Sequence, residues 1–291
     1  MERKDPSWPY SKHGIIQNYG VGHLQKIWDL RCNQDIGDIF SYIYTENGFE
    51  NAEDLCVSMD GICVMYPYSD RSLSAMTTKL HLDQHPGIYS KPFKGYTGPE
   101  LSPSSFSSIQ GFVTLEDMYA DHGTLRLISG SHHYHADLVR ESNRESKWWS
   151  LSPEHYDFLI LNGCKDIRIP QGSNSEICNT LGYIPAGSLV IWDSRVVHCA
   201  EVHRREIPQD HRRWRYIVYI SYQPKSLIST TMLKKRISAF ENLRMTGHLV
   251  SNPFLFPIKP DSRYDKRDHI QYYNLRPIAT ERMRSLIGYP E

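Results

Sequence analysis

The chain of 291 residues is long enough to bury a full hydrophobic core, and it suits a single domain over residues 1–291 better than two domains. Hydrophobic residues make up 40% of it and charged residues 23%, which is ordinary for a soluble globular protein. Lys+Arg and Asp+Glu both count 33. No net charge therefore recruits nucleic acid or an anionic membrane, and we expect neither as a partner.

The cysteines and the N-terminus bear on the compartment. The six cysteines include no C-x-x-C pair and are predicted to be reduced thiols. The N-terminal segment MERKDPSWPYSKHG has no apolar h-region, and no stretch approaches the roughly 20 apolar residues of a membrane span. These features predict a cytoplasmic protein.

The first 50 residues are predicted to be mainly helical. From Gly20 to about Tyr44, apolar residues recur at helical spacing, which predicts an amphipathic helix or a helix pair with an interruption near residues 35–37. The segment Leu55–Tyr66 predicts a β-hairpin whose two-residue turn is Asp60-Gly61.

Short segments rich in β-branched and aromatic residues predict a strand-dominated core over about residues 50–225. The predicted strands are Lys79–Asp83, Ser107–Leu115, Thr124–Ser129, Ile167–Pro170, Ser188–Trp192 and Trp214–Tyr222. Ser152 is predicted to cap a helix over Pro153–Asn162. A further helix is predicted near Thr230–Met245, in a C-terminal extension over residues 226–291.

A Pro- and Gly-rich stretch runs from Gln84 to Phe106. Long stretches without secondary structure inside a compact domain are usually lids, binding loops or disordered segments. Because this one begins directly after Asp83, we predict a lid over the site described next. A permanently packed surface excursion is the alternative.

Three residues have the spacing of metal ligands. His81 and Asp83 lie one residue apart on a predicted strand, so their side chains point to the same face. His198, far along the chain, can complete a triangle around a metal. Two histidines and one carboxylate form the facial triad of non-haem Fe(II) oxygenases, but zinc hydrolases use the same residue types. The three residues by themselves leave the metal open.

Two longer segments add a family resemblance. Ser107–His132 runs strand, acidic turn, strand and Gly-Ser-His, and Ala186–His198 is a Gly turn followed by an apolar strand and a histidine. With His81-x-Asp83, they resemble the phytanoyl-CoA dioxygenase family of Fe(II)/2-oxoglutarate oxygenases over about residues 80–224. The NG-x-L and PGSH elements of that family are similar to His122–Leu125 and Ser129–His132.

The resemblance implies a mainly β fold with flanking helices, a double-stranded β-helix or cupin-like jelly-roll barrel, with the metal at its open mouth. It implies His81, Asp83 and His198 as catalytic metal ligands, Fe(II) and 2-oxoglutarate as cofactor and cosubstrate, and O2 as oxidant. Succinate and CO2 are the implied by-products. Since Asp83 retains the carboxylate that halogenase relatives lack, the implied reaction is hydroxylation.

The family also binds the distal carboxylate of 2-oxoglutarate with an arginine, whose planar guanidinium pairs a carboxylate bidentately. Here a basic insertion, His203–Arg213, disturbs the usual spacing after His198. Arg213 and Arg215 lie on the same face of the next predicted strand. Counting back from the end of the strand favours Arg215, and Arg213 is the alternative.

Other residues near these motifs are candidate contacts or packing residues. Gln110 and Phe112 lie on the strand that in this fold lines the cosubstrate cavity, and Lys79 shares the face of His81 and Asp83, so all three are candidate cosubstrate contacts. Packing is expected for His132, His133 and His135, and a place in the lid or behind the ligands for His85.

The expected function is a 2-oxoglutarate-dependent dioxygenase that hydroxylates a small organic molecule. The arginines of the basic insertion allow for an anionic substrate. A catalytically silent binding module is one alternative, although buried charges around an empty site are costly. A zinc hydrolase is another, and it needs a glutamate base beside the metal.

Overall fold

The computed structural model describes residues 14–65, 79–84, 106–140, 149–170, 182–204, 207–208, 211–259 and 276–290. The chain divides into a terminal unit, Met1–Cys63 with Val218–Glu291, and a central unit, Val64–Ile217. The boundaries fall within strands β3 (Ile62–Met65) and β11 (Arg215–Ile220), which carry the chain from one unit to the other. The prediction of one domain stays a prediction.

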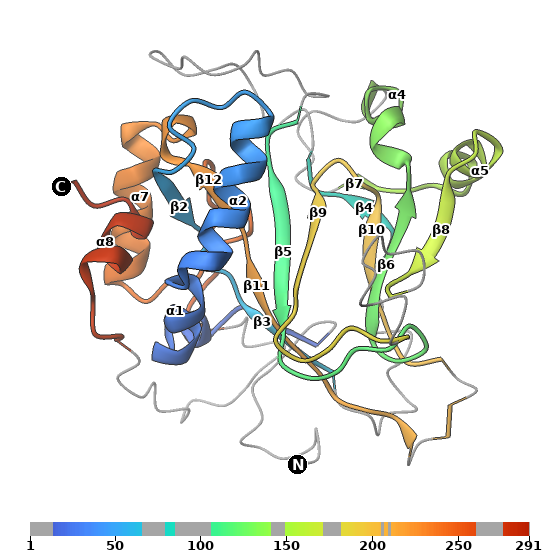
Figure 1. Cartoon of the computed structure of the whole chain (residues 1–291), viewed down its shortest axis with the longest axis horizontal. Coiled ribbons are helices and arrows are strands. Elements are labelled where there is room, and N and C mark those ends of the chain that lie inside the picture. Colours follow the sequence, from blue (N-terminus) through green and yellow to red (C-terminus); the bar gives the residue numbers. More distant parts are fainter. Residues whose placement is uncertain are drawn as a thin grey trace. The chain divides into compact units, whose positions relative to one another are not determined.

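The terminal unit combines helices from both ends of the chain (Figure 1). Its helices are α1 (Gln25–Arg31), α2 (Gln34–Glu46), α7 (Thr230–Glu241) and α8 (Glu281–Ile287), with strands β1 (Ile15–Ile16), β2 (Leu55–Val57) and β12 (Tyr222–Pro224) and short 3-10 turns at Val21–His23 and Lys225–Leu227. Fully buried Arg236 of α7 donates to the carbonyl oxygens of Val57, Leu286 and Ile287. The C-terminal extension is therefore bonded into the core of this unit.

For the N-terminal segment, predicted as one helix or a helix pair, the structure has the pair, and the break lies earlier than residues 35–37. The side chain of Asn33 accepts a hydrogen bond from the Ile36 backbone N–H at 3.1 Å and so caps α2. Residues 35–37, where we predicted an interruption, lie inside α2 because the cap starts the new helix just before them.

The predicted hairpin Leu55–Tyr66 is wrong in its pairing. Both strands form, but β2 pairs with β12 and β3 pairs with β1. A two-residue type I′ turn needs positive φ at both central residues, and neither Asp60 nor Gly61 has it. Instead the Asp60 carbonyl oxygen accepts a hydrogen bond from the buried Arg31 side chain at 2.7 Å.

The central unit contains two antiparallel sheets (Figure 1). In the first, β5 (Ile109–Thr114) lies between β9 (Leu189–Asp193) and the start of β11. The second has the order β7 (Trp149–Ser150), β4 (His81–Leu82), β10 (His198–Glu201), β6 (Thr124–Ser129) and β8 (Lys165–Arg168) among the described residues. This is the expected mainly β, double-stranded β-helix with flanking helices.

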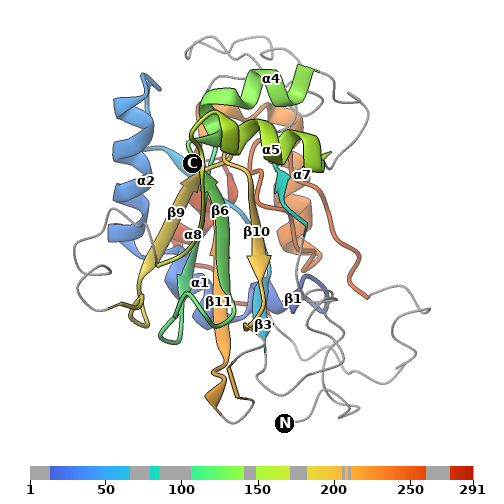
Figure 2. The same cartoon turned by 90° about the vertical axis from the view of Figure 1, so that its right-hand side faces the viewer.

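Two helices cover one face of the second sheet. Helices α4 (His135–Arg140) and α5 (Pro153–Leu161), which Figure 2 shows side by side, contribute to an apolar cluster with the sheet. The cluster contains Leu82, Ile128, Leu138, Val139, Leu159, Cys164 and Val197. Because side chains alternate along a strand, the residues next to Leu82 and Val197 face the other side, into the barrel.

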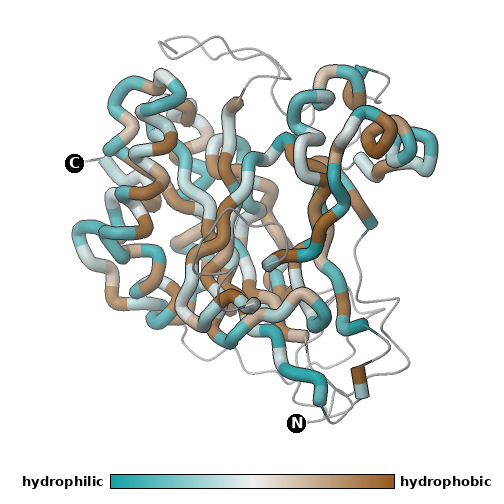
Figure 3. Tube along the Cα trace, turned by 45° about the vertical axis from the view of Figure 1, so that its right-hand side comes forward, coloured by the Kyte–Doolittle hydropathy of each residue, from teal (hydrophilic) through white to brown (hydrophobic). Residues whose placement is uncertain are grey.

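Local signals were read well where caps and apolar strands are strong. Strand β6 has the predicted bounds, and Ser152 caps α5 by accepting from the His155 N–H at 3.2 Å. Strand β4 is shorter than predicted. No helix in the described residues is both long and apolar enough to cross a bilayer, and the tube in Figure 3 alternates between apolar and polar colours.

Candidate metal centre

Strands β4 and β10 bring the two predicted histidine ligands together. His81 and His198 are directly opposite partners in the antiparallel ladder, so their side chains project from the same face. Their ring centroids are 4.5 Å apart. Leu82 points into the helix-covered cluster, and Asp83 returns to the histidine face.

Backbone carbonyl groups fix which nitrogen of each ring is available. His81 Nδ1 lies 2.7 Å from the Lys79 carbonyl oxygen, and His198 Nδ1 lies 2.9 Å from that of Val196. Since a carbonyl oxygen only accepts, Nδ1 carries the proton in both rings. In the neutral imidazole, Nε2 then keeps its lone pair, as a metal ligand requires.

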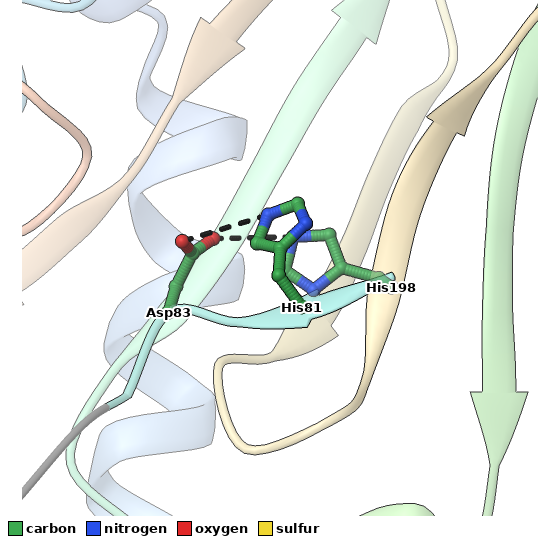
Figure 4. A group of neighbouring side chains, drawn as sticks. All are labelled: His81, Asp83 and His198. Carbon is green, nitrogen blue, oxygen red and sulfur yellow. Dashed lines mark ion pairs between the residues drawn. The ribbon is translucent and has the colours of Figure 1, made fainter. Parts of the chain in front are cut away.

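The Nε2 atoms of both rings point to the Asp83 carboxylate (Figure 4). His198 Nε2 lies 3.1 Å from Oδ2 and His81 Nε2 lies 3.7 Å from Oδ1, and one ligand atom from each residue lies within 4.8 Å of the others. Ligands about 2.0–2.2 Å from a shared metal are roughly 3 Å apart when adjacent. Two imidazoles and one carboxylate at this spacing fit Fe(II) in a facial site.

Gln110 and Trp192 surround this cluster from the first sheet. The Gln110 side-chain N–H donates to Asp83 Oδ2 at 2.8 Å, so Gln110 contacts a predicted metal ligand. The Trp192 ring lies 5.2 Å from that of His198. Gln110 Oε1 and Trp192 Nε1 are buried and have no hydrogen-bond partner among the described residues. Such atoms are costly to bury unless a bound molecule satisfies them.

Arg215 and Arg213 have different surroundings. Arg215 is 4% exposed, and its guanidinium carbon lies 5.4 Å from the centre of the Phe112 ring. A Cβ on Gly123 would lie 3.4 Å from Arg215 Cδ, so this glycine leaves room for the arginine inside the barrel. Arg213 is exposed and lies over the Tyr119 ring. The Phe112 and Trp192 rings, 5.9 Å apart, extend the wall from Arg215 toward His198.

The basic insertion is partly buried. His203 and Arg212 are 3% and 8% exposed, whereas Arg204 is exposed. His203 Nδ1 accepts a hydrogen bond from the Gly123 N–H at 3.2 Å, and burial lowers the pKa of His203 to about 4. His203 is therefore neutral at physiological pH.

The other candidates lie outside the cluster. Lys79 is exposed and contributes its carbonyl oxygen to His81. His132 and His133 have ring centroids 3.9 Å apart, and buried His135 bonds to the Gln84 carbonyl oxygen. Of the predicted lid, Gln84 and Phe106 are described, whereas residues 85–105, which include His85, lie outside the described residues.

Sequence reasoning missed Trp192 and Gln84. Trp192 is the direct cross-strand partner of Gln110, so aligning the two strands would have revealed it. Gln84 is fully buried, although a polar residue at the start of a loop is normally predicted to be exposed.

Known proteins agree with the resemblance. Residues 75–206 match the family model for phytanoyl-CoA dioxygenase (PhyH). A curated relative, Ava biosynthesis cluster protein O from Aspergillus versicolor, is 24% identical over 253 residues, which is 85% of this chain and 72% of the relative.

Two solved structures are similar at low identity. The non-haem α-ketoglutarate-dependent carbocyclase SnoK of nogalamycin biosynthesis is 19% identical, with a TM-score of 0.32, over 56% of this chain and 47% of SnoK. GlcNAc Inducible Gene 2 from Candida albicans is 16% identical, with a TM-score of 0.49, over 83% of this chain and 59% of that protein. The chain thus spans about half the length of these structures.

The family match and the geometry coincide on the same part of the chain. His81, Asp83 and His198 all lie within the matched residues 75–206 and form a cluster that can hold a metal. The resemblance inferred from His81-x-Asp83 and the two longer segments is confirmed, because residues 75–206 match the phytanoyl-CoA dioxygenase family model.

Proposed function

We propose that this protein is an Fe(II)- and 2-oxoglutarate-dependent oxygenase that hydroxylates a small organic molecule. The observation that carries the proposal is the His81, Asp83 and His198 cluster, with both Nε2 atoms directed at the carboxylate, inside the family-matched segment. When bound there, Fe(II) supplies the family's redox chemistry, in which O2 and 2-oxoglutarate are consumed and succinate and CO2 are released.

The chain's own residues would orient the reactants. Arg215 is the proposed partner of the distal carboxylate of 2-oxoglutarate, because it is buried in the wall formed by Phe112. Gln110 holds Asp83 through one amide atom, and its buried Oε1 and the Trp192 N–H can bind the cosubstrate or substrate. The aromatic wall excludes water from the reacting atoms.

Hydroxylation is the reaction proposed because Asp83 keeps the third ligand position occupied by a carboxylate. The name of the Aspergillus versicolor relative places that protein in a biosynthesis cluster, which supports a small-molecule substrate here. An anionic substrate is compatible with exposed Arg204 in the segment after β10.

Succinate release tests the proposal. Purified protein with Fe(II), 2-oxoglutarate and O2 should form succinate, and fractions of a metabolite extract that contain the substrate should stimulate the rate. Under anaerobic conditions, Fe(II) with 2-oxoglutarate should give a weak visible charge-transfer band, which a zinc site cannot give. If the metal-loaded protein gives neither succinate nor the band, a catalytically silent binding module becomes the better interpretation.

Product analysis then tests the reaction type. Hydroxylation predicts a product heavier by one oxygen atom that derives from labelled O2. A product of equal mass would indicate an epimerisation, and one lacking two hydrogens a ring closure or desaturation. Either of these results would retain the oxygenase proposal and overturn the hydroxylation.

A further inference from the structure

Gln84, the residue after Asp83, is completely buried in the central unit. Its side-chain Oε1 accepts hydrogen bonds from Ser107 Oγ at 3.0 Å and from Ser194 Oγ at 2.7 Å. Both lone pairs of this oxygen are therefore used, as a buried amide requires. The backbone is held as well, because the Gln84 N–H donates to the Ser194 carbonyl oxygen at 3.3 Å and the Gln84 carbonyl oxygen accepts from His135 Nε2 at 2.7 Å.

Ser194 belongs to the turn between β9 and β10, which leads directly to His198. Two further bonds hold that turn: the Val196 N–H donates to the Asp193 carbonyl oxygen at 3.0 Å, and the Val197 N–H donates to Ser131 Oγ at 2.9 Å. A displacement of Ser194 is thus passed to His198 through a short, bonded segment.

The ladder between β4 and β10 is too short to fix Asp83. Strand β4 has two residues, and its pairing with β10 is at His81↔His198. Asp83 lies beyond the end of that strand. The two hydrogen bonds between Gln84 and Ser194 connect the segment that carries Asp83 with the segment that leads to His198, on the far side of Asp83 from His81.

We propose that Gln84 is a positioning residue that sets the separation of the Asp83 carboxylate from the His198 imidazole by binding Ser194. The inference rests on the proposed metal site and deepens it, because it means that the protein aligns Asp83 with His198 before a metal binds. Residues that orient metal ligands from behind typically change metal affinity roughly 10- to 100-fold when they are removed.

Co(II) binding to the full-length protein tests this proposal, with the visible Co(II) spectrum as a second readout of ligand geometry. Gln84→Leu and Ser194→Ala should each weaken Co(II) binding roughly 10- to 100-fold and change the spectrum. Thr124→Val is the matched control, since it removes a buried hydroxyl that donates to the Ile169 carbonyl oxygen at 2.7 Å in the same unit. It should lower the free energy of unfolding and leave Co(II) affinity and spectrum unchanged.

Two outcomes separate the proposal for Gln84 from the proposal of the metal site. If His198→Ala binds Co(II) as tightly as wild type, the metal site itself is wrong. If His198→Ala abolishes binding while folded Gln84→Leu and Ser194→Ala bind normally, only the positioning role is overturned. The double variant should bind no more weakly than Gln84→Leu, because both changes break the same connection. Should Gln84→Leu not fold, Ser194→Ala decides the question.

Discussion

The sheet that contains strand β10 has one carboxylate near this strand on each face, Asp83 and Glu201, and the two carboxylates have different neighbours. On the barrel face, Asp83 meets the imidazoles of His81 and His198 and the amide of Gln110. On the helix-covered face, the Glu201 carboxylate binds the guanidinium groups of Arg126 at 3.1 Å and Arg168 at 3.0 Å.

On the helix-covered face, Glu201 belongs to an ionic network, called the outer network below, in which two arginines pair with two carboxylates. Arg126 also binds Asp166, and the Tyr156 hydroxyl donates to the same carboxylate at 2.8 Å. The partners of Asp83 named above are two imidazoles and an amide, and an imidazole, unlike a guanidinium, can bind a metal together with a carboxylate. The neighbours of a carboxylate therefore help to identify its role: arginines indicate a structural network, and imidazoles whose Nε2 atoms face the carboxylate indicate a ligand set.

Removing an imidazole from the barrel face should have the largest effect. His81→Ala or His198→Ala should abolish succinate formation and metal binding while the far-ultraviolet circular dichroism stays the same, because the apolar core does not depend on the metal. Turnover of 2-oxoglutarate at the wild-type rate in either variant would contradict the assignment.

Arg215→Ala should raise the 2-oxoglutarate concentration needed for half-maximal turnover. Loss of a buried charged partner costs about 2–5 kcal/mol, which corresponds to roughly 30- to 5,000-fold. Arg213→Ala is the control and should behave as wild type, since Arg213 is exposed. The reverse pattern would show that the strand after the insertion was aligned wrongly. Either way, steady-state kinetics gives the answer.

Lowering the pH should reduce the free energy of unfolding through two groups, His203 and Asp166, over different pH ranges. Burial lowers the pKa of His203 from 6.5 to about 4, so the unfolded chain binds the extra proton and stability falls as pH drops from 6.5 to 4. The loss is roughly 3 kcal/mol. Urea unfolding at several pH values should show that the free energy of unfolding depends less on pH for His203→Gln. An unchanged pH dependence would mean that His203 does not cause the loss of stability.

The outer network responds at lower pH. The hydrogen bond from Arg126 lowers the pKa of the Asp166 carboxyl below its ordinary value of 3.8. Its stabilising contribution is therefore present above that value and is lost as pH falls through the lower pKa of the folded protein.

Arg126→Met should have the smallest effect. It breaks ion pairs whose side chains are 14% to 30% exposed, so solvent screens them, and the expected loss in the free energy of unfolding is about 1–2 kcal/mol. Metal affinity should not change. A large drop in metal affinity would mean that the ionic network on one face of the sheet influences the metal site on the other.

Much of the central unit could be predicted because its signals are local. Alternation placed His81 and Asp83 on one face, and the cap Ser152 fixed the start of α5. Strand pairing was not predictable in the same way. The hairpin predicted at Asp60-Gly61 failed because β2 and β3 find partners far away in the chain, and a turn signal carries no information about such partners.

The same limit applies to the site. Residue types and spacing predicted His81, Asp83 and His198 as metal ligands, and the structure brings these three residues together. The contact of Gln110 with Asp83 and the burial of Gln84 depend on how two sheets face each other, and a polar residue beside a loop gives no sign of that in the sequence. The difference in burial between Arg213 and Arg215, which supports the proposal for Arg215, could not be predicted from the sequence for the same reason.

The shortness of β4 has a consequence for the stability of the protein against proteolysis in the cell. Its two residues hold His81 beside His198, and a metal shared by them would staple segments that are distant in the chain, as a cross-link does. A ligand that binds the native state alone adds about 2.7 kcal/mol at 100 times its dissociation constant. Resistance to cellular proteases, and with it the steady-state amount of the protein, should therefore rise and fall with the iron supply.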